Sequence, residues 1–356
     1  MRLLVNIIDF PISPCYDEIG FEVIKIATIR DIAKLANVSA STVSRVLNLD
    51  QTINISIETR KRIFEAAEQL SYQKPERDSS NLQKYALVHW YDEIDELNDP
   101  FFLSIRLGIE RECEINNISL EKYFNSGSGH TFKEVQKKYQ GMIVLGKFSK
   151  SYLEYFEEHA KNIILVHDYS KEFKFESVIV NFEELTRDVL NTMITQGHEK
   201  IGFICGREKV VGSKDILIDE REATFIDHMT KLNLYDKKYL RIGDFSYSDG
   251  YLMMKDIIVN SDILPTSIFI ASDSLAIGAL RALSDYDIKV PETISIISCN
   301  NIPVAEYTTP CLSTVKISTE FMGTLSAQLL INQNQRKEKI RYTIPHKIIL
   351  RDTFKI

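Results

Sequence analysis

The sequence lacks the patterns of several common protein classes. No run approaches the roughly 18 uninterrupted apolar residues that a membrane-spanning helix needs. Residues 1–9 are too short, and too broken by Asn6 and Asp9, to form an export signal. These absences predict a cytoplasmic protein.

Cysteine is scarce and scattered. The chain has five cysteines, an odd number with no Cys-x-x-Cys pair: Cys15, Cys113, Cys205, Cys299 and Cys311. This distribution excludes a disulfide framework and a cysteine-rich zinc site. We expect reduced thiols in or near a core, and neither a bound metal nor a cofactor.

Catalytic motifs are absent as well. The chain contains no Gly-x-Ser-x-Gly, His-Glu-x-x-His, phosphate-binding loop or Gly-x-Gly-x-x-Gly sequence. His159, His167 and His198 have no nucleophile or metal ligand beside them in the sequence. We therefore predict that the protein is not an enzyme and has no catalytic residues.

The charge of the chain is divided unevenly. Its 356 residues, 44% hydrophobic and 26% charged, are enough for two or three domains, and the formal net charge is −7. Residues 27–84 carry nine Lys or Arg and seven Asp or Glu, a net of +2, whereas residues 1–26 and 85–356 are acidic. The positive segment is a candidate nucleic-acid-binding module, although a solvated helix face around Arg60–Arg62 would give the same excess.

Three short helices are predicted within this positive segment. Thr28 can cap the first helix, with an acid at Asp31 and apolar residues at helical spacing: Ile29, Ile32, Ala33 and Ala36. Ser39 can cap the second helix after the break at residues 37–39, and Ser56 the third. We expect the second helix to turn Val43, Val46 and Leu47 inward, and the third to turn Ile63, Phe64, Ala67 and Leu70 inward.

The first two of these helices form a helix-turn-helix pattern. The outward face of the second carries Ala40, Ser41, Ser44, Arg45 and Asn48. Short side chains allow a helix to approach the major groove closely, and an arginine can pair with guanine edges or phosphate. An ordinary three-helix bundle that binds no DNA is the alternative.

Residues 27–48 read ATIRDIAKLANVSASTVSRVLN. This string resembles the DNA-binding headpiece of the LacI/GalR family of bacterial transcriptional regulators. The resemblance implies a homodimer on a palindromic DNA operator, with a headpiece at residues 27–73. The residues that it places at the DNA are Thr28, Ser39, Ala40, Ser41, Thr42, Ser44, Arg45 and Asn48.

A polar segment follows the headpiece. Residues 74–84 contain Pro75 and a single apolar residue, Leu82, which is typical of a linker. In the family this segment becomes a hinge helix on the operator, and a leucine enters the minor groove. The resemblance assigns that role to Leu82, although Ser79 stands where the family has alanine.

Beyond residue 85, short apolar runs alternate with helical patterns, which predicts parallel βαβ units. The length fits two doubly wound sheets better than one. The fold class expected is therefore α/β: a three-helix headpiece followed by a core of two doubly wound parallel-sheet subdomains.

Four further motifs resemble the periplasmic-binding-protein-like core of the same family: NDPFF (98–102), QGHEKIGFI (196–204), ASDSLAIGALRA (271–282) and TPCLSTV (309–315). The resemblance implies an N-subdomain at 85–182 and 316–342 and a C-subdomain at 183–315 and 343–356. Two stretches, WYDEIDEL (90–97) before the first of these motifs and SCNNIP (298–303), most resemble repressors of galactose and β-galactoside operons within the family, of the evolved β-galactosidase repressor type.

Several polar and aromatic residues follow predicted strands, at the ends where open α/β sheets bind ligands. The resemblance assigns the effector site to Asp168, Arg221, Phe245, Ser272 and Asn300, with Asp273 beside them. Ser272 and Asn300 stand where many relatives have Asn and Asp. Other roles stay open: a helix cap for Asp273, a core position for Phe245, and a pair with Asp219 for Arg221.

Residues 1–26 match nothing in this pattern. They are either an extension upstream of the native start or a tail that packs through Leu3, Leu4, Ile7 and Ile8. Intact-mass analysis of the native protein would distinguish the two.

Together these features predict a DNA-binding repressor of a sugar-utilisation operon that a small-molecule sugar releases from its operator. Three alternatives stay open: a family member that responds to a nucleobase, one that responds to a phosphorylated carrier protein, and a sugar-binding protein without DNA binding.

Overall fold

The computed structural model describes residues 27–47, 55–70, 72, 83–92, 96, 100–125, 132, 135–168, 174–333 and 338–355. They belong to two compact units, one within residues 1–78 and one within residues 79–356. The segment 1–26, most of the predicted linker, Asn48 and Leu82 lie outside the described residues.

The first unit contains three helices, α1 (Ile29–Leu35), α2 (Ala40–Leu47) and α3 (Ile57–Gln69). Thr28 and Asp31 form a reciprocal capping box at the start of α1, as predicted. The Ser39 hydroxyl accepts a hydrogen bond from the Thr42 amide (3.1 Å), and the Ser56 hydroxyl accepts one from the Thr59 amide (3.1 Å). These caps fix where α2 and α3 begin.

A small apolar core holds the three helices together. Ile32, Val43, Val46 and Ile63 are fully buried in it. The prediction that Phe64 points inward is wrong, because 42% of this residue is exposed. Consecutive helix residues point about 100° apart, so a face centred on Ile63 and Ala66 leaves residue 64 outside.

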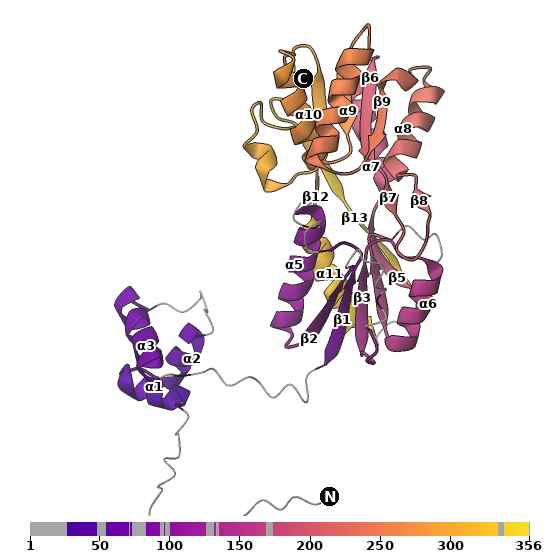
Figure 1. Cartoon of the computed structure of the whole chain (residues 1–356). Helices are drawn as coiled ribbons and strands as arrows, with labels where there is room; N and C mark the ends of the chain where they lie inside the picture. The colour runs from indigo at the N-terminus through magenta and orange to yellow at the C-terminus, as the bar shows by residue number, and fades with distance from the viewer. Residues whose placement is uncertain are drawn as a thin grey trace, which may run out of the picture. The chain divides into compact units, whose positions relative to one another are not determined.

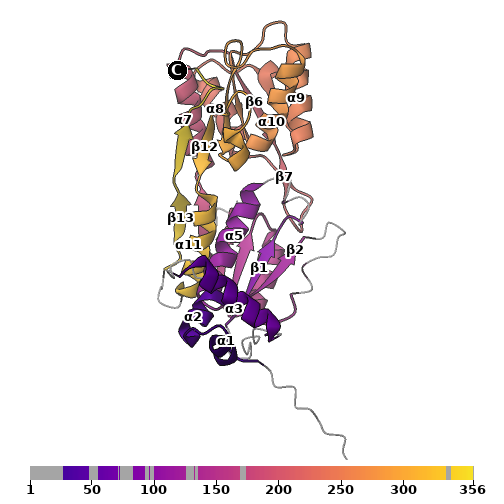
Figure 2. The ribbon, with the colours of Figure 1, turned by 90° about the vertical axis from the view of Figure 1, so that its left-hand side faces the viewer.

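The second unit consists of two lobes, each built on a six-stranded sheet (Figures 1 and 2). The N-lobe sheet is parallel throughout. Its strands in spatial order are β13 (Arg341–Ile344), β5 (Glu176–Val180), β4 (Ile163–Val166), β3 (Gly141–Leu145), β1 (Lys84–His89) and β2 (Ser119–Phe124). Helices α5 (Pro100–Ile115) and α11 (Thr319–Ile331) cover one face and α6 (Lys150–His159) the other.

The C-lobe sheet is parallel except for its edge strand β14. Its strands in spatial order are β14 (His346–Ile349), β12 (Thr314–Ile317), β11 (Ser295–Asn300), β10 (Ser267–Ile270), β6 (Ile201–Gly206) and β9 (Leu240–Gly243). Helices α9 (Tyr247–Asn260) and α10 (Asp273–Asp285) lie on one face, and α7 (Phe182–Thr195) and α8 (Glu220–Lys231) on the other (Figure 1). Shorter elements are β7 (Glu208–Lys209), β8 (Ile216–Leu217), η3 (Lys237–Tyr239) and η4 (Pro303–Glu306).

Buried strands explain why the sequence folds this way. Every residue of β3, β4 and β10 is buried, as expected for parallel strands covered on both faces.

Within the described residues the chain crosses between the lobes three times, after β5, after β12 and between β13 and β14. No described helix is both long enough and apolar enough to cross a membrane.

Candidate functional site

The outward face of α2 is the candidate nucleic-acid surface. Ala40, Ser41 and Arg45 are exposed, and Thr42 and Ser44 are half-buried. The Ser39 hydroxyl bonds the hydroxyls of Ser41 (2.8 Å) and Thr42 (2.7 Å), which holds short polar groups in order at the start of the helix. A helix with such a face can enter a major groove closely and present its arginine to base edges or phosphates.

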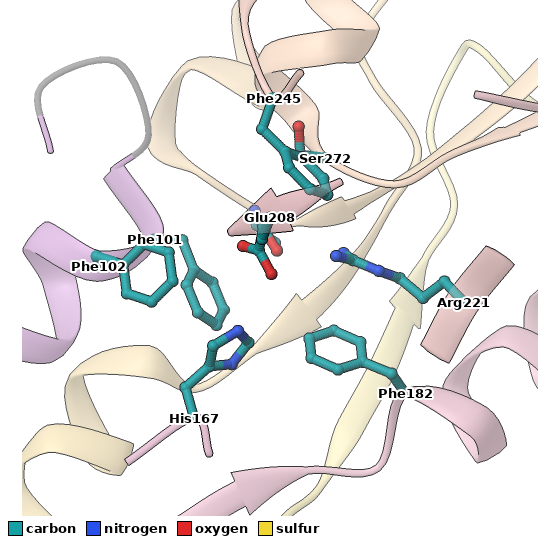
Figure 3. A pocket seen from close by; sticks show the side chains of 9 residues that line it. Phe101, Phe102, His167, Phe182, Glu208, Arg221, Phe245 and Ser272 are labelled. Carbon is teal, nitrogen blue, oxygen red and sulfur yellow. The ribbon is translucent and has the colours of Figure 1, made fainter. Parts of the chain in front are cut away.

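The second unit carries a pocket where the two lobes meet. About 260 Å³ of space, part of it open to solvent, remains between its lining residues. Four of the effector-site residues that the resemblance assigned line it: Arg221, Phe245, Ser272 and Asn300. The others in the lining are Phe101, Phe102, His167, Phe182 and Glu208 (Figure 3).

Arg221 is fixed in the pocket wall by an ion pair. Its Nε and Nη2 donate to the two carboxylate oxygens of Asp219 (2.8 and 2.7 Å), and its Nη1 donates to the Ala271 carbonyl (2.6 Å). Both side chains are about 5% exposed. Burial alone would raise the pKa of Asp219, but the Arg221 guanidinium outweighs it and lowers that pKa to about 2. The sequence left open whether Arg221 pairs with Asp219. In the structure it does, and Arg221 also lines the pocket.

Aromatic rings pack around this guanidinium. The Arg221 Cζ lies 4.4 Å from the Phe182 ring centroid and 5.2 Å from that of Phe245. Phe245 lies against Gly206 at the end of β6, where a Cβ atom would come within 2.4 Å of the ring. The ring of Phe245 can occupy this place because residue 206 has no side chain.

His167 forms the N-lobe side of the pocket. It follows β4 directly, and its ring lies 5.3 Å from Phe101, 5.2 Å from Phe102 and 5.7 Å from Phe182, centroid to centroid. Burial lowers the pKa of His167 well below 6.5, and the charges of Lys147 and Arg221 lower it further. The imidazole is therefore neutral at pH 7.

Two polar residues at the C-lobe strand ends complete the wall. The Ser272 hydroxyl accepts a hydrogen bond from the Leu275 amide (3.2 Å) and caps α10. Asn300, at the end of β11, is buried with φ of 112°, and its side chain makes no hydrogen bond to another described residue. An asparagine amide offers both donors and an acceptor, so Asn300 can bind a polar ligand.

Two of the assigned residues are not among those that line the pocket. Asp168 follows His167, and its side chain is not part of the pocket lining. Asp273 is fully buried and accepts hydrogen bonds from the Thr314 hydroxyl (2.6 Å), the Ile302 amide (2.7 Å) and the Ser298 hydroxyl. Its carboxylate thus holds the loop after β11 in place, whereas Ser272 caps the helix.

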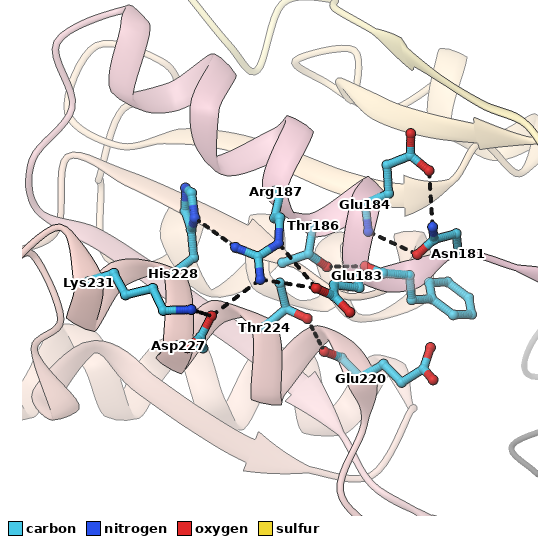
Figure 4. A network of polar contacts seen from close by, with 11 residues as sticks. Asn181, Glu183, Glu184, Thr186, Arg187, Glu220, Thr224, Asp227, His228 and Lys231 are labelled. Atoms are coloured by element: carbon cyan, nitrogen blue, oxygen red, sulfur yellow. Dashed lines mark hydrogen bonds and ion pairs between the residues drawn. The ribbon is translucent and has the colours of Figure 1, made fainter. Parts of the chain in front are cut away.

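A polar network on the outside of the C-lobe fixes the two helices that carry Phe182 and Arg221 (Figure 4). Arg187 of α7 donates to Asp227 (3.2 Å) of α8 and to Glu183 (3.0 Å) of its own helix. It also contacts the His228 ring (3.2 Å). These contacts keep α7 and α8 in register, so that the aromatic ring and the guanidinium meet in the pocket.

The sequence reasoning missed five of the lining residues. Phe101 and Phe102 belong to the NDPFF motif, which carried only the family resemblance. His167 and Glu208 each come soon after a buried strand, so the rule that ligands bind at strand ends could have found both. Phe182 comes two residues after β5, and nothing in the sequence singled it out.

A wider depression adjoins the pocket and shares Phe101 and Asn300 with it. It encloses about 840 Å³ of space, part of it open to solvent, and is also lined by the crossing segment Lys316–Phe321. No group of three or more His, Cys, Asp or Glu side chains that could hold a metal ion is found in the described part of the chain.

A helix-turn-helix unit and a two-lobed core with a pocket between its lobes define a ligand-responsive DNA-binding regulator. Two family profiles match this division: "Bacterial regulatory proteins, lacI family" at residues 28–75 and "Periplasmic binding protein-like domain" at residues 190–354.

Similar proteins share nearly the whole chain. The HTH-type transcriptional regulator GalR of Streptococcus thermophilus is 36% identical over 317 residues, 88% of this chain and 95% of its own. The HTH-type transcriptional regulator GanR of Bacillus subtilis (strain 168) is 34% identical over 321 residues, 89% of this chain and 96% of its own. The chain belongs to the LacI family of bacterial transcriptional regulators, and it is a regulator rather than an enzyme.

Solved structures agree on the fold. A complex of the transcriptional regulator CelR with cellobiose has a TM-score of 0.67 at 23% identity, covering 92% of this chain and 99% of that one. The lac repressor dimer bound to operator and the anti-inducer ONPF has a TM-score of 0.64 at 20% identity, with the same coverage. The predicted fold class is confirmed.

Proposed function

We propose that the protein represses a galactose or β-galactoside utilisation operon and that a neutral sugar in the inter-lobe pocket releases it from DNA. The observation that carries the effector class is the charge balance of the pocket. Arg221 is paired with Asp219, Glu208 with Lys147, and His167 is neutral. A charged ligand would lose its hydration in a site that offers no charge to compensate it. The pocket therefore favours a neutral ligand.

The rest of the lining suits a sugar. A pyranose presents hydroxyl groups around its rim and C–H groups on its faces. Asn300 and Ser272 can exchange hydrogen bonds with hydroxyls, and the Phe245 ring can cover a C–H face. A galactoside with a second ring would extend into the adjoining depression around Lys316–Phe321. As the resemblance implies, Asp168, which directly follows the lining residue His167, would also contact the sugar, with Asp273 beside the site.

At the DNA, we propose that Ala40, Ser41 and Arg45 face the bases of the major groove. Thr28, Ser39, Thr42 and Ser44 would bond the backbone or neighbouring base edges, as would Asn48. Leu82 would enter the minor groove at the centre of the operator. Asn48 and Leu82 lie outside the described residues.

We propose a homodimer that places two headpieces on a palindromic operator. Leu252 and Val259, 58% and 59% exposed, stand seven residues apart on the same side of α9, with the exposed Lys255 and Asp256 between them. Sedimentation at micromolar concentration should give twice the chain mass. Substitution of Leu252 and Val259 by Glu should give monomers, and an unchanged dimer would show that this side of α9 is not the interface.

The experiment for the proposed function measures binding to DNA upstream of the protein's own gene, at one fixed salt concentration. The proposal predicts specific binding that galactose, lactose or allolactose weakens, through the different affinity of the sugar for the two lobe arrangements. Specific binding that no galactoside changes would exclude this effector class and leave the headpiece assignment standing. Binding no tighter than to random DNA would contradict the repressor function.

A further inference from the structure

A buried ion pair connects the two lobes in the wall of the pocket. Lys147 follows β3 in the N-lobe, and Glu208 begins β7 in the C-lobe. The Lys147 Nζ contacts the Glu208 Oε2, and the side chains are 11% and 8% exposed. Among the described residues that line the pocket, Glu208 is the one with a carboxylate.

Main-chain contacts to the other lobe hold Glu208 in position. The segment between β7 and β8 lies against the N-lobe: the Val211 amide donates to the Lys147 carbonyl (2.9 Å), and the Ser149 amide donates to the Val211 carbonyl (2.9 Å). Gly212, at φ of 81°, lies so close to Tyr152 that a Cβ atom would come within 2.2 Å of its ring. On the other side of Glu208 the Arg207 amide donates to the Gly243 carbonyl of the C-lobe (2.9 Å), so both lobes restrict where the carboxylate can lie.

The carboxylate has capacity left for a ligand. An ionised carboxylate can accept about four hydrogen bonds, and Lys147 accounts for one of them through Oε2. No hydrogen bond from another described residue to Oε1 is found. In Figure 3 the Glu208 carboxylate points into the middle of the pocket, between the aromatic rings and Arg221.

We propose that Glu208 is a specificity-determining residue for the effector. It accepts hydrogen bonds from hydroxyl groups of a neutral sugar, and it repels sugars that carry a carboxylate or a phosphate. Lys147 balances the charge of Glu208. Because the ion pair joins the two lobes, the position of the Glu208 carboxylate depends on the arrangement of the lobes. This inference rests on the proposed sugar-binding function of the pocket.

Calorimetric titration of the full-length protein with galactose tests this role. Glu208→Gln should weaken galactose binding by about tenfold to a hundredfold, because hydrogen bonds to a charged acceptor are the stronger kind. Lys147→Gln breaks the same ion pair but keeps the carboxylate, so it should retain most of the affinity. Equal losses in the two variants would show that the ion pair is only structural and would overturn the proposal.

Glu222 provides a matched control. It is also buried (5% side-chain exposure) and paired with an arginine, Arg207 (2.5 Å), but it does not line the pocket. The galactose affinity of Glu222→Gln should stay within about twofold of that of the unchanged protein. Such a change is much smaller than the loss expected when a ligand contact is removed. If Glu208→Gln fails to fold, Glu208→Gln combined with Lys147→Met leaves no buried unpaired charge, and it should show the same loss of affinity.

The choice between neutral and acidic sugars gives a second readout. The unchanged protein should prefer galactose to galacturonate by at least about tenfold, and Glu208→Gln should narrow that ratio. A purely structural residue would leave the ratio unchanged, which would contradict the proposal. If the unchanged protein binds no galactoside, the effector class itself is wrong and the inference falls with it. Unchanged galactose affinity in Glu208→Gln would overturn the inference alone.

The single tryptophan reports on the same ion pair. Trp90 is 3% exposed, and the Lys147 Nζ lies 5.7 Å from its ring centroid. Galactose at Glu208 should therefore change Trp90 emission in the unchanged protein. In Glu208→Gln the midpoint of this change should move to higher sugar concentration by the factor that calorimetry gives, and an unmoved midpoint would contradict the proposal.

Discussion

Replacement of Asp219 by Asn tests how much the buried pair with Arg221 stabilises the pocket. Asp219 is the N-cap of α8, where its side chain accepts a hydrogen bond from the Arg221 amide (2.8 Å). Asn is an equally good N-cap, so the substitution keeps the cap and removes the charge. The change therefore isolates the electrostatic part of the interaction.

The structure sets the expected size of the effect. The pair lowers the pKa of Asp219 from 3.8 to about 2, which corresponds to a stabilisation on the order of 2 kcal/mol. Breaking a buried pair also leaves the Arg221 charge uncompensated, and such losses typically reach about 3–5 kcal/mol. We expect Asp219→Asn to lower the free energy of unfolding by about 2–5 kcal/mol at pH 7.

Urea unfolding followed by circular dichroism measures this loss. Asp219→Asn combined with Arg221→Met should recover part of it, because no buried charge is then left unpaired. The contribution of the pair should be complete above pH 3.8 and should disappear as the pH falls through 2. A single variant within about 0.5 kcal/mol of the unchanged protein at pH 7 would refute the reasoning, since substitutions without a structural role commonly fall in that range.

Three further predictions follow from particular residues. Gly206→Ala should displace the Phe245 ring and weaken galactose binding by about tenfold in calorimetry, which corresponds to about 1.4 kcal/mol of binding free energy. An unchanged galactose affinity would rule out a contact between the Phe245 ring and the sugar. Arg45→Ala should cost about 1–3 kcal/mol of operator binding, and an equal loss on random DNA would make Arg45 a phosphate contact. Burial lowers the pKa of His89 to about 4, although Glu96 raises it. The free energy of unfolding should therefore fall by about 2 kcal/mol as the pH is lowered from 6.5 to 5. In His89→Gln this pH dependence should be weaker, and an unchanged pH dependence would contradict the prediction.

Local patterns made the headpiece predictable. Capping residues at Thr28, Ser39 and Ser56 mark the helix starts directly, and the structure uses all three. The error at Phe64 shows the limit of this reasoning. A large apolar side chain next to a buried position looks like core, but the helix period decides which of two neighbours points inward.

The core was predictable where strands are continuously buried and alternate with helices. The short strands β7 and β8 have no such pattern, since their residues are half-buried or exposed, and the ion pair of Glu208 with Lys147 joins residues 61 positions apart. A contact between residues so far apart in the chain cannot be predicted from their spacing in the sequence. Which strand-end residues face the pocket also depends on packing: Asp273 lies beside Ser272, yet its carboxylate is taken up by Thr314 and Ile302.

The central claim is that a sugar in the pocket and DNA at the headpiece act on one conformational equilibrium. Thermodynamic linkage makes this measurable: the factor by which galactose weakens operator binding must equal the factor by which operator DNA weakens galactose binding. The account predicts that calorimetric titration of galactose into the free protein and into the operator complex, at one salt concentration, gives affinities that differ by this factor. Equal galactose affinity with and without operator DNA would contradict it.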